Sequence, residues 1–315
     1  MSQLFYPFDR SPPEGQACLD RVYRAFEPYG VAYPFCRQCF SEDAELTMRR
    51  ANRRKAPYEQ FSGIYFEHPE CSGGVDTYKH WLPRRLEIAF IDYRGFDNDI
   101  VEQTARLDFL NWAEDEQTAL RPLFARAAIN WMRDGKLDPL GFQPGVSENF
   151  VKGPYEGPDT VIREITAMLM LLRVDMNDFV DWLLDPASGN QPAKVWYCLA
   201  EMLGEAFDGY LARGDAYLVL PDGADEAAYR KALDALQQRS RNDVAARLRS
   251  MDLTALGLQM LETHPDAVRQ VEECESYLPD ADLQQTPDER AQGEVALLRV
   301  IDKSISKPGR VDDKS

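Results

Sequence analysis

The amino-acid sequence predicts an all-α protein, a multi-helix bundle of packed helical hairpins with few or no strands. Apolar residues recur at steps of three and four along most of the chain, which is the period of a helix with one buried face. Capping residues precede several of these segments, and glycine or proline follows them, as helix ends require. Only a few short runs, such as 216–221, have the composition of a strand. A clean repeat of about 34 or 40 residues is missing, so a HEAT-like solenoid stays one arrangement among several.

The N-terminal half predicts a continuous series of helices. Ser41 is a good N-cap for the second of them, which has acidic residues in its first turn and basic residues in its last. Pro83 falls inside the fourth, where it should either kink the helix or open another one. The helices expected in this half span 13–30, 42–50, 57–66, 73–93, 97–114 and 114–135.

The segment 136–159 separates two expected domains. It contains four prolines and four glycines, which rule out regular structure, and it is long for a loop inside one compact domain. We therefore expect an N-terminal helical domain with a C-x-x-C segment at 1–135, a linker at 136–159, an acidic helical domain at 160–303 and a disordered tail at 304–315. The helices expected in the second domain span 160–184, 194–214, 225–251, 253–264 and 289–303.

The composition limits the partners and the compartment. The chain of 315 residues carries a net charge of -17, so its surface repels nucleic acid and anionic membranes and attracts basic proteins. Simple solubility is the alternative explanation for the charge. No apolar run reaches the roughly 20 residues of a membrane span, and the first ten residues lack the features of a signal peptide. We expect a cytoplasmic protein whose six cysteines are free thiols.

The sequence lacks the signatures of common enzyme families. It contains no G-x-S-x-G, H-E-x-x-H, Walker lysine loop or dinucleotide fingerprint. A helical enzyme is one hypothesis, and its candidate residues would lie on adjacent turns around Pro83, namely His80, Arg84, Arg85 and Glu87. An ion-paired helix surface explains these residues better, so we expect no enzymatic activity.

A C-x-x-C motif formed by Cys36 and Cys39 is the candidate for metal chemistry. Zinc needs two further ligands, and the nearest suitable pair is His68 and Cys71, which would complete a Cys3His set. A redox pair is a weaker alternative, because no βαβ pattern surrounds the motif. The interpretation favoured by the flanking aromatic residues is a buried structural turn. We therefore expect no obligatory cofactor, with zinc as the alternative.

Acidic residues concentrate in two segments. Residues 262–289 contain nine acids and one base, and residues 97–116 contain seven acids and one base. A solvated helix face is the ordinary explanation, whereas a surface that steers a basic partner is the functional one. The candidate partner-binding residues are Glu262, Asp266, Glu272, Glu273, Glu275, Tyr277, Asp280, Asp282, Asp97 and Asp99.

Two motifs of the N-terminal half carry a resemblance to a known family. The segment CRQCF at 36–40, followed by KHWLPRRLEIAF at 79–90, resembles an uncharacterised bacterial family in which C-x-x-C-[FY] precedes a K-H-[FW]-L-P-R helix. Trp112 and Trp131 also fit, and the resemblance covers roughly residues 30–135. The position that matches Cys71 is usually not a cysteine in that family, which argues against that residue as a ligand.

The resemblance implies a binding function. Some relatives of that family resemble immunity proteins paired with secreted bacterial toxins, including nuclease effectors of type VI secretion. We therefore expect a non-enzymatic acidic protein that neutralises a cognate basic, nuclease-like toxin by direct binding, without contacts to nucleic acid or membranes. A homodimer is left open. The alternative is a zinc-binding helical protein that uses Cys36 and Cys39 in a structural or catalytic role.

Overall fold

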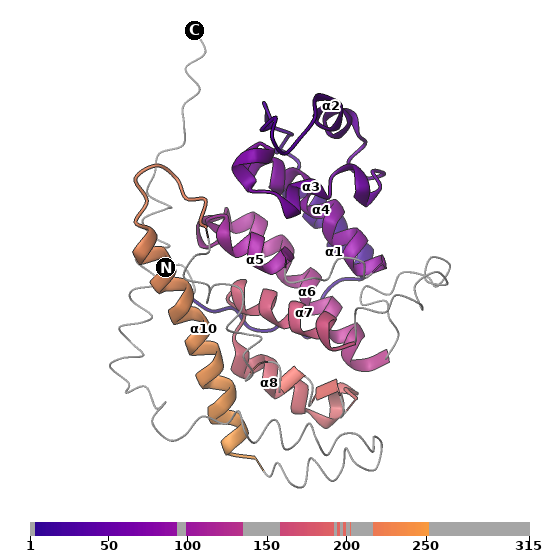
Figure 1. Cartoon of the computed structure of the whole chain (residues 1–315). Helices are drawn as coiled ribbons and strands as arrows, with labels where there is room; N and C mark the ends of the chain where they lie inside the picture. The colour runs from indigo at the N-terminus through magenta and orange to yellow at the C-terminus, as the bar shows by residue number, and fades with distance from the viewer. Residues whose placement is uncertain are drawn as a thin grey trace.

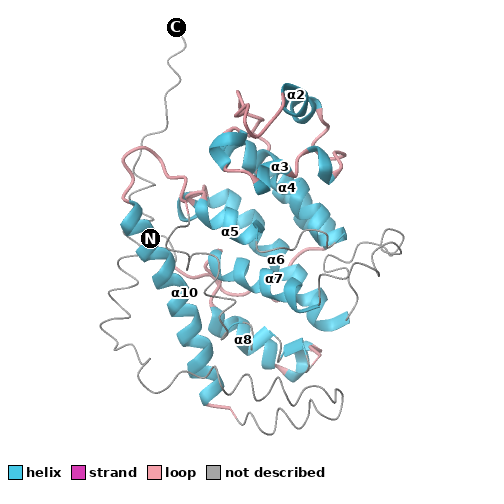
Figure 2. Ribbon diagram, viewed as in Figure 1, coloured by secondary structure: helices cyan, strands magenta, loops and turns pink. Residues whose placement is uncertain are grey.

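All regular structure in the described part of the chain is helical, so the predicted all-α class is confirmed (Figure 2). The computed structural model describes residues 4–92, 99–134, 158–191, 194–195, 198–199, 202 and 217–251. The longer helices are α1 (Gly15–Ala25), α2 (Glu42–Arg50), α4 (Gly74–Asp92), α5 (Asp99–Arg106), α6 (Glu114–Asp134), α7 (Pro158–Leu171), α8 (Met176–Leu184) and α10 (Glu226–Arg249). The short ones are η1 (Tyr58–Gln60), α3 (Gly63–Phe66), η2 (Pro69–Ser72), η3 (Phe109–Asn111) and η5 (Pro186–Ser188).

Several helix boundaries differ from the prediction. The segment 57–66 is not one helix but η1 followed by α3. The segment 97–114 is interrupted after α5 at Asp108, whose φ of 54° is left-handed, and 160–184 is interrupted at Arg173, whose φ is 60°. Pro83 does not open a second helix, because α4 runs through it without a break. The run at 217–220 is not a strand.

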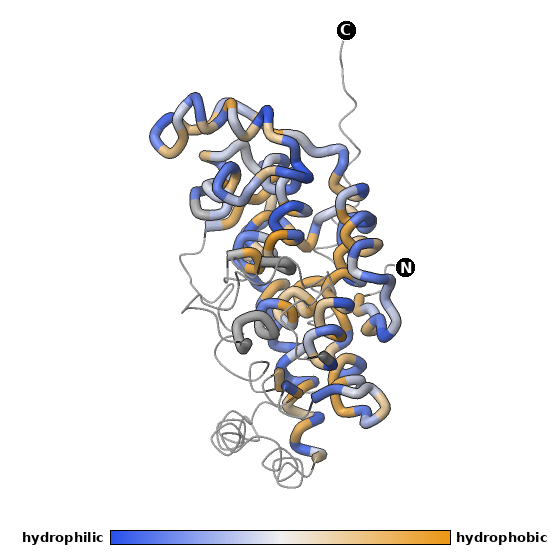
Figure 3. The backbone as a smooth tube through the Cα atoms, turned by 90° about the vertical axis from the view of Figure 1, so that its right-hand side faces the viewer, coloured by the Kyte–Doolittle hydropathy of each residue, from blue (hydrophilic) through white to orange (hydrophobic). Residues whose placement is uncertain are grey.

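The longer helices pack around one hydrophobic core. Helix α6 lies between α1 and α7, and α10 runs along one side of α7 and α8 (Figure 1). Hydrophobic positions concentrate where these helices face one another (Figure 3). The core includes residues from both sides of the expected linker, from Phe8 to Leu248. The linker lies almost entirely outside the described residues, and the division into two domains stays a prediction.

The N-terminal segment ties the two halves of the chain together. The Tyr6 N–H donates to the Arg173 carbonyl at 2.9 Å, and the Asp175 N–H donates back to the Tyr6 carbonyl at 2.7 Å. Two residues later, Phe8 packs against the rings of Phe179 and Trp182 in α8. These backbone bonds hold Arg173 in its left-handed conformation, which separates α7 from α8.

A buried ion pair joins α4 to α6. The ammonium of Lys79 lies 2.7 Å from Oε2 of Glu116, and the other carboxylate oxygen, Oε1, accepts a hydrogen bond from the Tyr29 hydroxyl. Burial lowers the pKa of Lys79, although the Glu116 carboxylate acts to raise it. Burial and the hydrogen bond to that carboxylate both raise the pKa of Tyr29. Because an isolated buried charge is costly, this pair fixes how α4 sits on α6.

Residues 31–73 form a distinct end of the molecule, which we call the cysteine region. It holds α2, η1, α3 and η2, and Figure 1 shows α2 and α3 at the end of the molecule opposite α8. We call α1 together with the helices from α4 to α10 the helical body. The cysteine region is built from elements of three, four and nine residues, whereas most helices of the body are longer.

Candidate metal centre

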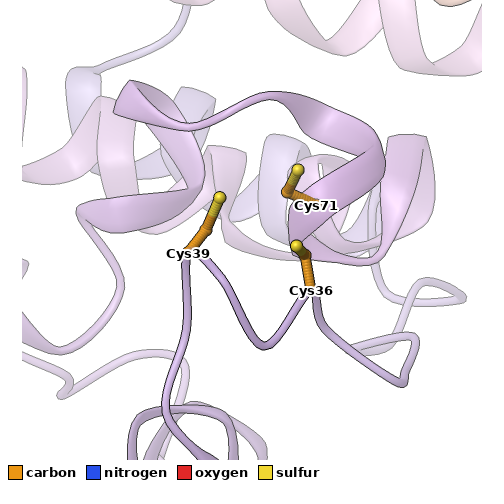
Figure 4. Close-up of side chains that lie close together, drawn as sticks. All are labelled: Cys36, Cys39 and Cys71. Carbon is orange, nitrogen blue, oxygen red and sulfur yellow. The ribbon is translucent and has the colours of Figure 1, made fainter.

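Three cysteines from two segments of the cysteine region come together. The sulfur atoms of Cys36, Cys39 and Cys71 all lie within 4.8 Å of one another (Figure 4). Among the residues that the structure describes, no other three histidine, cysteine, aspartate or glutamate side chains approach this closely. A tetrahedral zinc ion with Zn–S bonds near 2.3 Å would hold its sulfurs about 3.8 Å apart. Small side-chain movements are therefore enough to close the group around an ion.

Backbone hydrogen bonds build the cluster. The N–H groups of Cys39 and Phe40 donate to the Cys36 carbonyl at 3.2 and 2.9 Å, which closes the C-x-x-C turn. The Cys36 N–H donates to the Cys71 carbonyl at 2.8 Å, so the turn is bonded directly to the segment that carries the third thiol. The rings of Phe35 and Phe40 are buried and meet edge to face with centroids 5.0 Å apart. The turn is thus positioned by the backbone and by its two flanking rings.

Helix α2 braces the turn through a buried carboxylate. Glu45 is 5% exposed, and one of its carboxylate oxygens accepts the Phe35 N–H at 3.2 Å. The same oxygen lies 2.7 Å from the guanidinium of Arg37, inside the turn. Ser41 accepts the Ala44 N–H at 3.1 Å, which confirms it as the N-cap of this helix. The carboxylate of Glu45 therefore fixes the C-x-x-C turn to helix α2.

Two glycines allow the segments to approach. Gly73 has a φ of +86°, and a Cβ there would lie 2.5 Å from the carbonyl oxygen of Ala32. A Cβ on Gly63 would lie 2.8 Å from the ring of Phe40. The Ala32 carbonyl before the turn and the Phe40 ring after it thus each pack directly against a glycine.

The three thiols have different electrostatic surroundings. The pKa of Cys36 is lowered, because the backbone N–H groups of Gln38 and Cys39 point at its sulfur and stabilise the thiolate. The pKa of Cys39 is raised to about 12 by its hydrogen bond to the carboxylate of Glu67, with desolvation adding to the effect. Desolvation also raises the pKa of Cys71. A bound cation would remove these penalties, since it stabilises all three thiolates at once.

The expected ligand set is only partly brought together. Cys36, Cys39 and Cys71 form the cluster, but His68 lies outside it, with its ring 3.9 Å from that of Tyr217 between centroids. The favoured interpretation of a buried turn also needs correction, because Cys39 is exposed although its flanking aromatic rings are buried.

The structure describes one of the ten candidate partner-binding residues. Glu262, Asp266, Glu272, Glu273, Glu275, Tyr277, Asp280, Asp282 and Asp97 lie outside the described residues, and Asp99 is the first residue of α5. The proposed acidic surface therefore stays a prediction.

The residues of the enzyme hypothesis make separate contacts. Arg84 and Glu87 form an ion pair at 2.7 Å, as expected for a helix surface. His80 donates through Nδ1 to the Tyr29 carbonyl at 2.7 Å, and burial lowers its pKa. Arg85 is fully buried against two tyrosine rings. These side chains therefore have structural partners.

Comparisons with known proteins yield no relative. No family model, no curated protein and no solved structure matches this chain. Within the described helices, none has an apolar stretch long enough to cross a membrane. Function is therefore argued from the geometry of the cysteine cluster and from the charge of the chain.

Proposed function

We propose that the chain is a metal-binding helical protein in which Cys36, Cys39 and Cys71 hold a zinc ion. The observation that supports this most is the meeting of three sulfurs within 4.8 Å, on segments bonded to each other through Cys36 and Cys71. Thiolates are soft ligands that favour zinc over magnesium or calcium. The backbone of the C-x-x-C turn and of the segment bonded to it holds the three sulfurs close together before any ion binds.

Three thiols favour a metal site over a redox pair. A disulfide bonds two sulfur atoms and leaves the third as a free thiol, whereas a tetrahedral ion binds all three. The N–H groups aimed at Cys36 stabilise a thiolate, which is the form that binds metal. The bound ion would carry the positive charge that three neighbouring thiolates need.

The role that fits this site is structural. Helices as short as those of the cysteine region are unstable in isolation, because the hydrogen bonds of a few residues do not offset the free-energy cost of nucleating a helix. An ion that joins Cys36 and Cys39 to Cys71 closes a loop of the chain that contains α2, η1 and α3 and ends within η2. Structural zinc sites contribute about 10–16 kcal/mol of binding free energy in small peptides. The ion would therefore stabilise the region that is least supported by long helices.

Metal content of the purified chain tests this proposal. We expect one zinc ion per chain in protein purified under reducing conditions, and loss of zinc in Cys36→Ser and Cys71→Ser. Cys198→Ala is the matched control, because Cys198 is buried in the helical body and far from the cluster in sequence. Elemental analysis measures the zinc content of each protein, and titration with a chromophoric chelator measures the zinc that is released. Absence of zinc, cobalt and cadmium binding in the reduced protein would contradict the proposal.

A second candidate function rests on the charge. We propose that the same protein binds a basic partner, as an immunity protein that neutralises a nuclease-like toxin of a type VI secretion system in the cytoplasm. The net charge of -17 supports this, because carboxylates can imitate the phosphate backbone that a nuclease binds. The motif resemblance of residues 36–40 and 79–90 supports it independently. Such a protein needs no catalytic residues.

Charge reversal tests this second candidate. Glu272→Lys, Glu273→Lys and Glu275→Lys together should slow association with a cognate basic toxin and weaken its dependence on salt. Surface plasmon resonance at two salt concentrations measures this, with Asp20→Lys as a control for a single charge reversal on α1. Unchanged association in the triple variant would place the interface elsewhere.

A further inference from the structure

The C-x-x-C turn places two of the three sulfurs where they can bond to each other. The Cys39 N–H donates to the Cys36 carbonyl at 3.2 Å, which is the hydrogen bond that closes a β-turn. The Cα atoms at the two ends of such a turn lie less than about 7 Å apart, and disulfides span Cα separations of about 4.4–6.8 Å. The two sulfurs lie within 4.8 Å of each other, so rotation about the side-chain bonds can join them.

Among the three cysteines of the cluster, Cys39 is the one that solvent reaches most easily. Its side chain is exposed, whereas those of Cys36 and Cys71 are half-buried. Arg37 and Gln38, the two residues between the cysteines of the turn, are exposed as well, so the turn lies at the surface of the cysteine region. Because the oxidation of a thiolate depends on its exposure, a small oxidant dissolved in water meets the Cys39 sulfur first.

The third cysteine of the cluster comes from a later part of the sequence. Cys71 lies in η2, and the elements α2, η1 and α3 stand between it and Cys39. An ion bound to all three sulfurs closes this long loop, whereas a disulfide between Cys36 and Cys39 closes only the turn. Formation of that disulfide therefore removes the connection to Cys71 that the ion provides, although it adds a covalent bond.

We propose that the cysteine region loses its ion on oxidation, because hydrogen peroxide joins Cys36 and Cys39 in a disulfide. This inference rests on the proposed zinc site. The ion needs at least three protein ligands, and after oxidation Cys71 is the one thiolate of the cluster that is left. Metal binding and disulfide formation therefore exclude each other. The site holds zinc in the reduced protein and responds to oxidants by releasing it.

Oxidation takes two steps and consumes one molecule of peroxide. The Cys39 thiolate attacks a peroxide oxygen, so that an S–O bond forms, the O–O bond breaks and hydroxide leaves. The Cys36 thiolate then attacks the Cys39 sulfur, so that the S–S bond forms, the S–O bond breaks and a second hydroxide leaves. The two sulfurs lose two electrons, the peroxide gains them, and Zn²⁺ leaves with its charge unchanged. A dithiol reductant reverses the reaction by thiol–disulfide exchange.

Peroxide treatment of the zinc-loaded, full-length protein tests this proposal. We expect one zinc ion to be released for each disulfide formed, as measured with a chromophoric chelator. Trypsin cleaves after Arg37, so a disulfide between Cys36 and Cys39 joins two peptides that mass spectrometry identifies. Dithiothreitol with added zinc should restore the starting zinc content. Cys198→Ala, in the helical body, is the control and should behave as the wild type does.

Two histidine substitutions identify the pair of sulfurs that reacts. Cys39→His and Cys71→His each replace one thiolate by an imidazole, which also binds zinc, so both variants are loaded with zinc before peroxide is added. Release above the peroxide-free rate should be at least about tenfold slower in Cys39→His, which lacks the exposed thiol. It should stay within about threefold of the wild type in Cys71→His, which keeps both cysteines of the turn.

The outcomes separate this inference from the proposed function. A disulfide between Cys36 and Cys71, or equally fast release in Cys39→His, would overturn the inference, because that bond would join the turn to Cys71. Retention of zinc at a peroxide dose that fully oxidises glutathione in the same buffer would also overturn it, while the metal site stands. If the reduced wild-type protein binds no zinc, cobalt or cadmium, the proposed function itself is wrong and this inference falls with it.

Discussion

Helices α2 and α8 are both nine residues long and both begin with a side-chain cap, yet they are held in place by different means. Helix α8 buries Met176, Phe179, Val180, Trp182 and Leu183, whereas α2 buries only Glu45 and Met48. At about 1.5–3 kcal/mol for each large buried apolar side chain, hydrophobic burial alone accounts for α8. It does not account for α2.

The difference teaches how the cysteine region is stabilised. Around α2 the chain relies on specific contacts: a carboxylate that braces the turn, two close approaches at glycine and a cluster of thiols. Such contacts act together, because each one holds the partners of the next in position. A metal ion at the thiols would be the strongest of them. The stability of the helical body should not depend on that ion.

Truncation of the body core should have the largest effect. Phe179→Ala removes a fully buried ring that packs on Phe8 and Trp182, and we expect a loss of about 3–5 kcal/mol in the free energy of unfolding. Because α8 is far from the cysteines, the loss should be equal with and without a zinc chelator. Urea denaturation followed by circular dichroism measures it. A loss that depends on the chelator would show that the two regions are not independent.

Closing the approach at Gly73 should come next. Gly73→Ala sets a Cβ against the Ala32 carbonyl oxygen in left-handed backbone, and we expect a cost of about 2–4 kcal/mol together with weakened zinc binding. Gly223→Ala is the matched control, since its φ is +76° but a Cβ there meets nothing within 4 Å. It should cost about 1 kcal/mol and leave zinc binding unchanged. Equal costs at the two positions would mean that the close approach adds nothing.

Removal of the brace should have an intermediate effect. Glu45→Ala leaves the Phe35 N–H without an acceptor and Arg37 without a partner, which we expect to cost about 1–3 kcal/mol. Because the turn loses its support, zinc affinity should also fall by about tenfold. Glu42→Ala, an exposed acid in the same helix, is the control for lost charge. Thermal melts and chelator competition measure both effects, and unaltered zinc affinity in Glu45→Ala would refute the bracing role.

Loss of a helix cap should have the smallest effect and distinguishes the regions most finely. Ser41→Ala and Asp175→Ala each remove an N-cap, and each should cost about 1 kcal/mol. Only Ser41→Ala should weaken zinc binding, because α2 follows directly after Cys39 and Phe40. Isothermal titration with zinc compares the two variants. A similar change in both would argue that the caps act through overall stability.

The sequence predicted the fold class because helical periodicity is a local signal. It did not predict the interruptions at Asp108 and Arg173, since neither residue favours left-handed backbone strongly enough to be recognised. The Arg173 carbonyl accepts the Tyr6 N–H, and the Asp175 N–H donates to the Tyr6 carbonyl, so this turn depends on a partner far away in the chain. Contacts of this kind leave no mark on local sequence.

The cysteine cluster was partly predictable for a similar reason. The C-x-x-C spacing identified Cys36 and Cys39, and proximity in sequence suggested Cys71. The same argument chose His68, because imidazole is a common zinc ligand and its spacing from Cys71 is suitable. Spacing does not tell which way a side chain faces, and His68 lies outside the cluster with its ring against that of Tyr217.

Native-state hydrogen exchange of the reduced protein, with zinc and after chelation, tests the central claim most directly. If an ion at Cys36, Cys39 and Cys71 supports the cysteine region, chelation should speed amide exchange throughout residues 31–73 by at least a hundredfold. Exchange in α6, α7 and α8 should stay the same, since their core does not depend on the ion. Unchanged exchange in residues 31–73, or equal acceleration in both regions, would contradict the account.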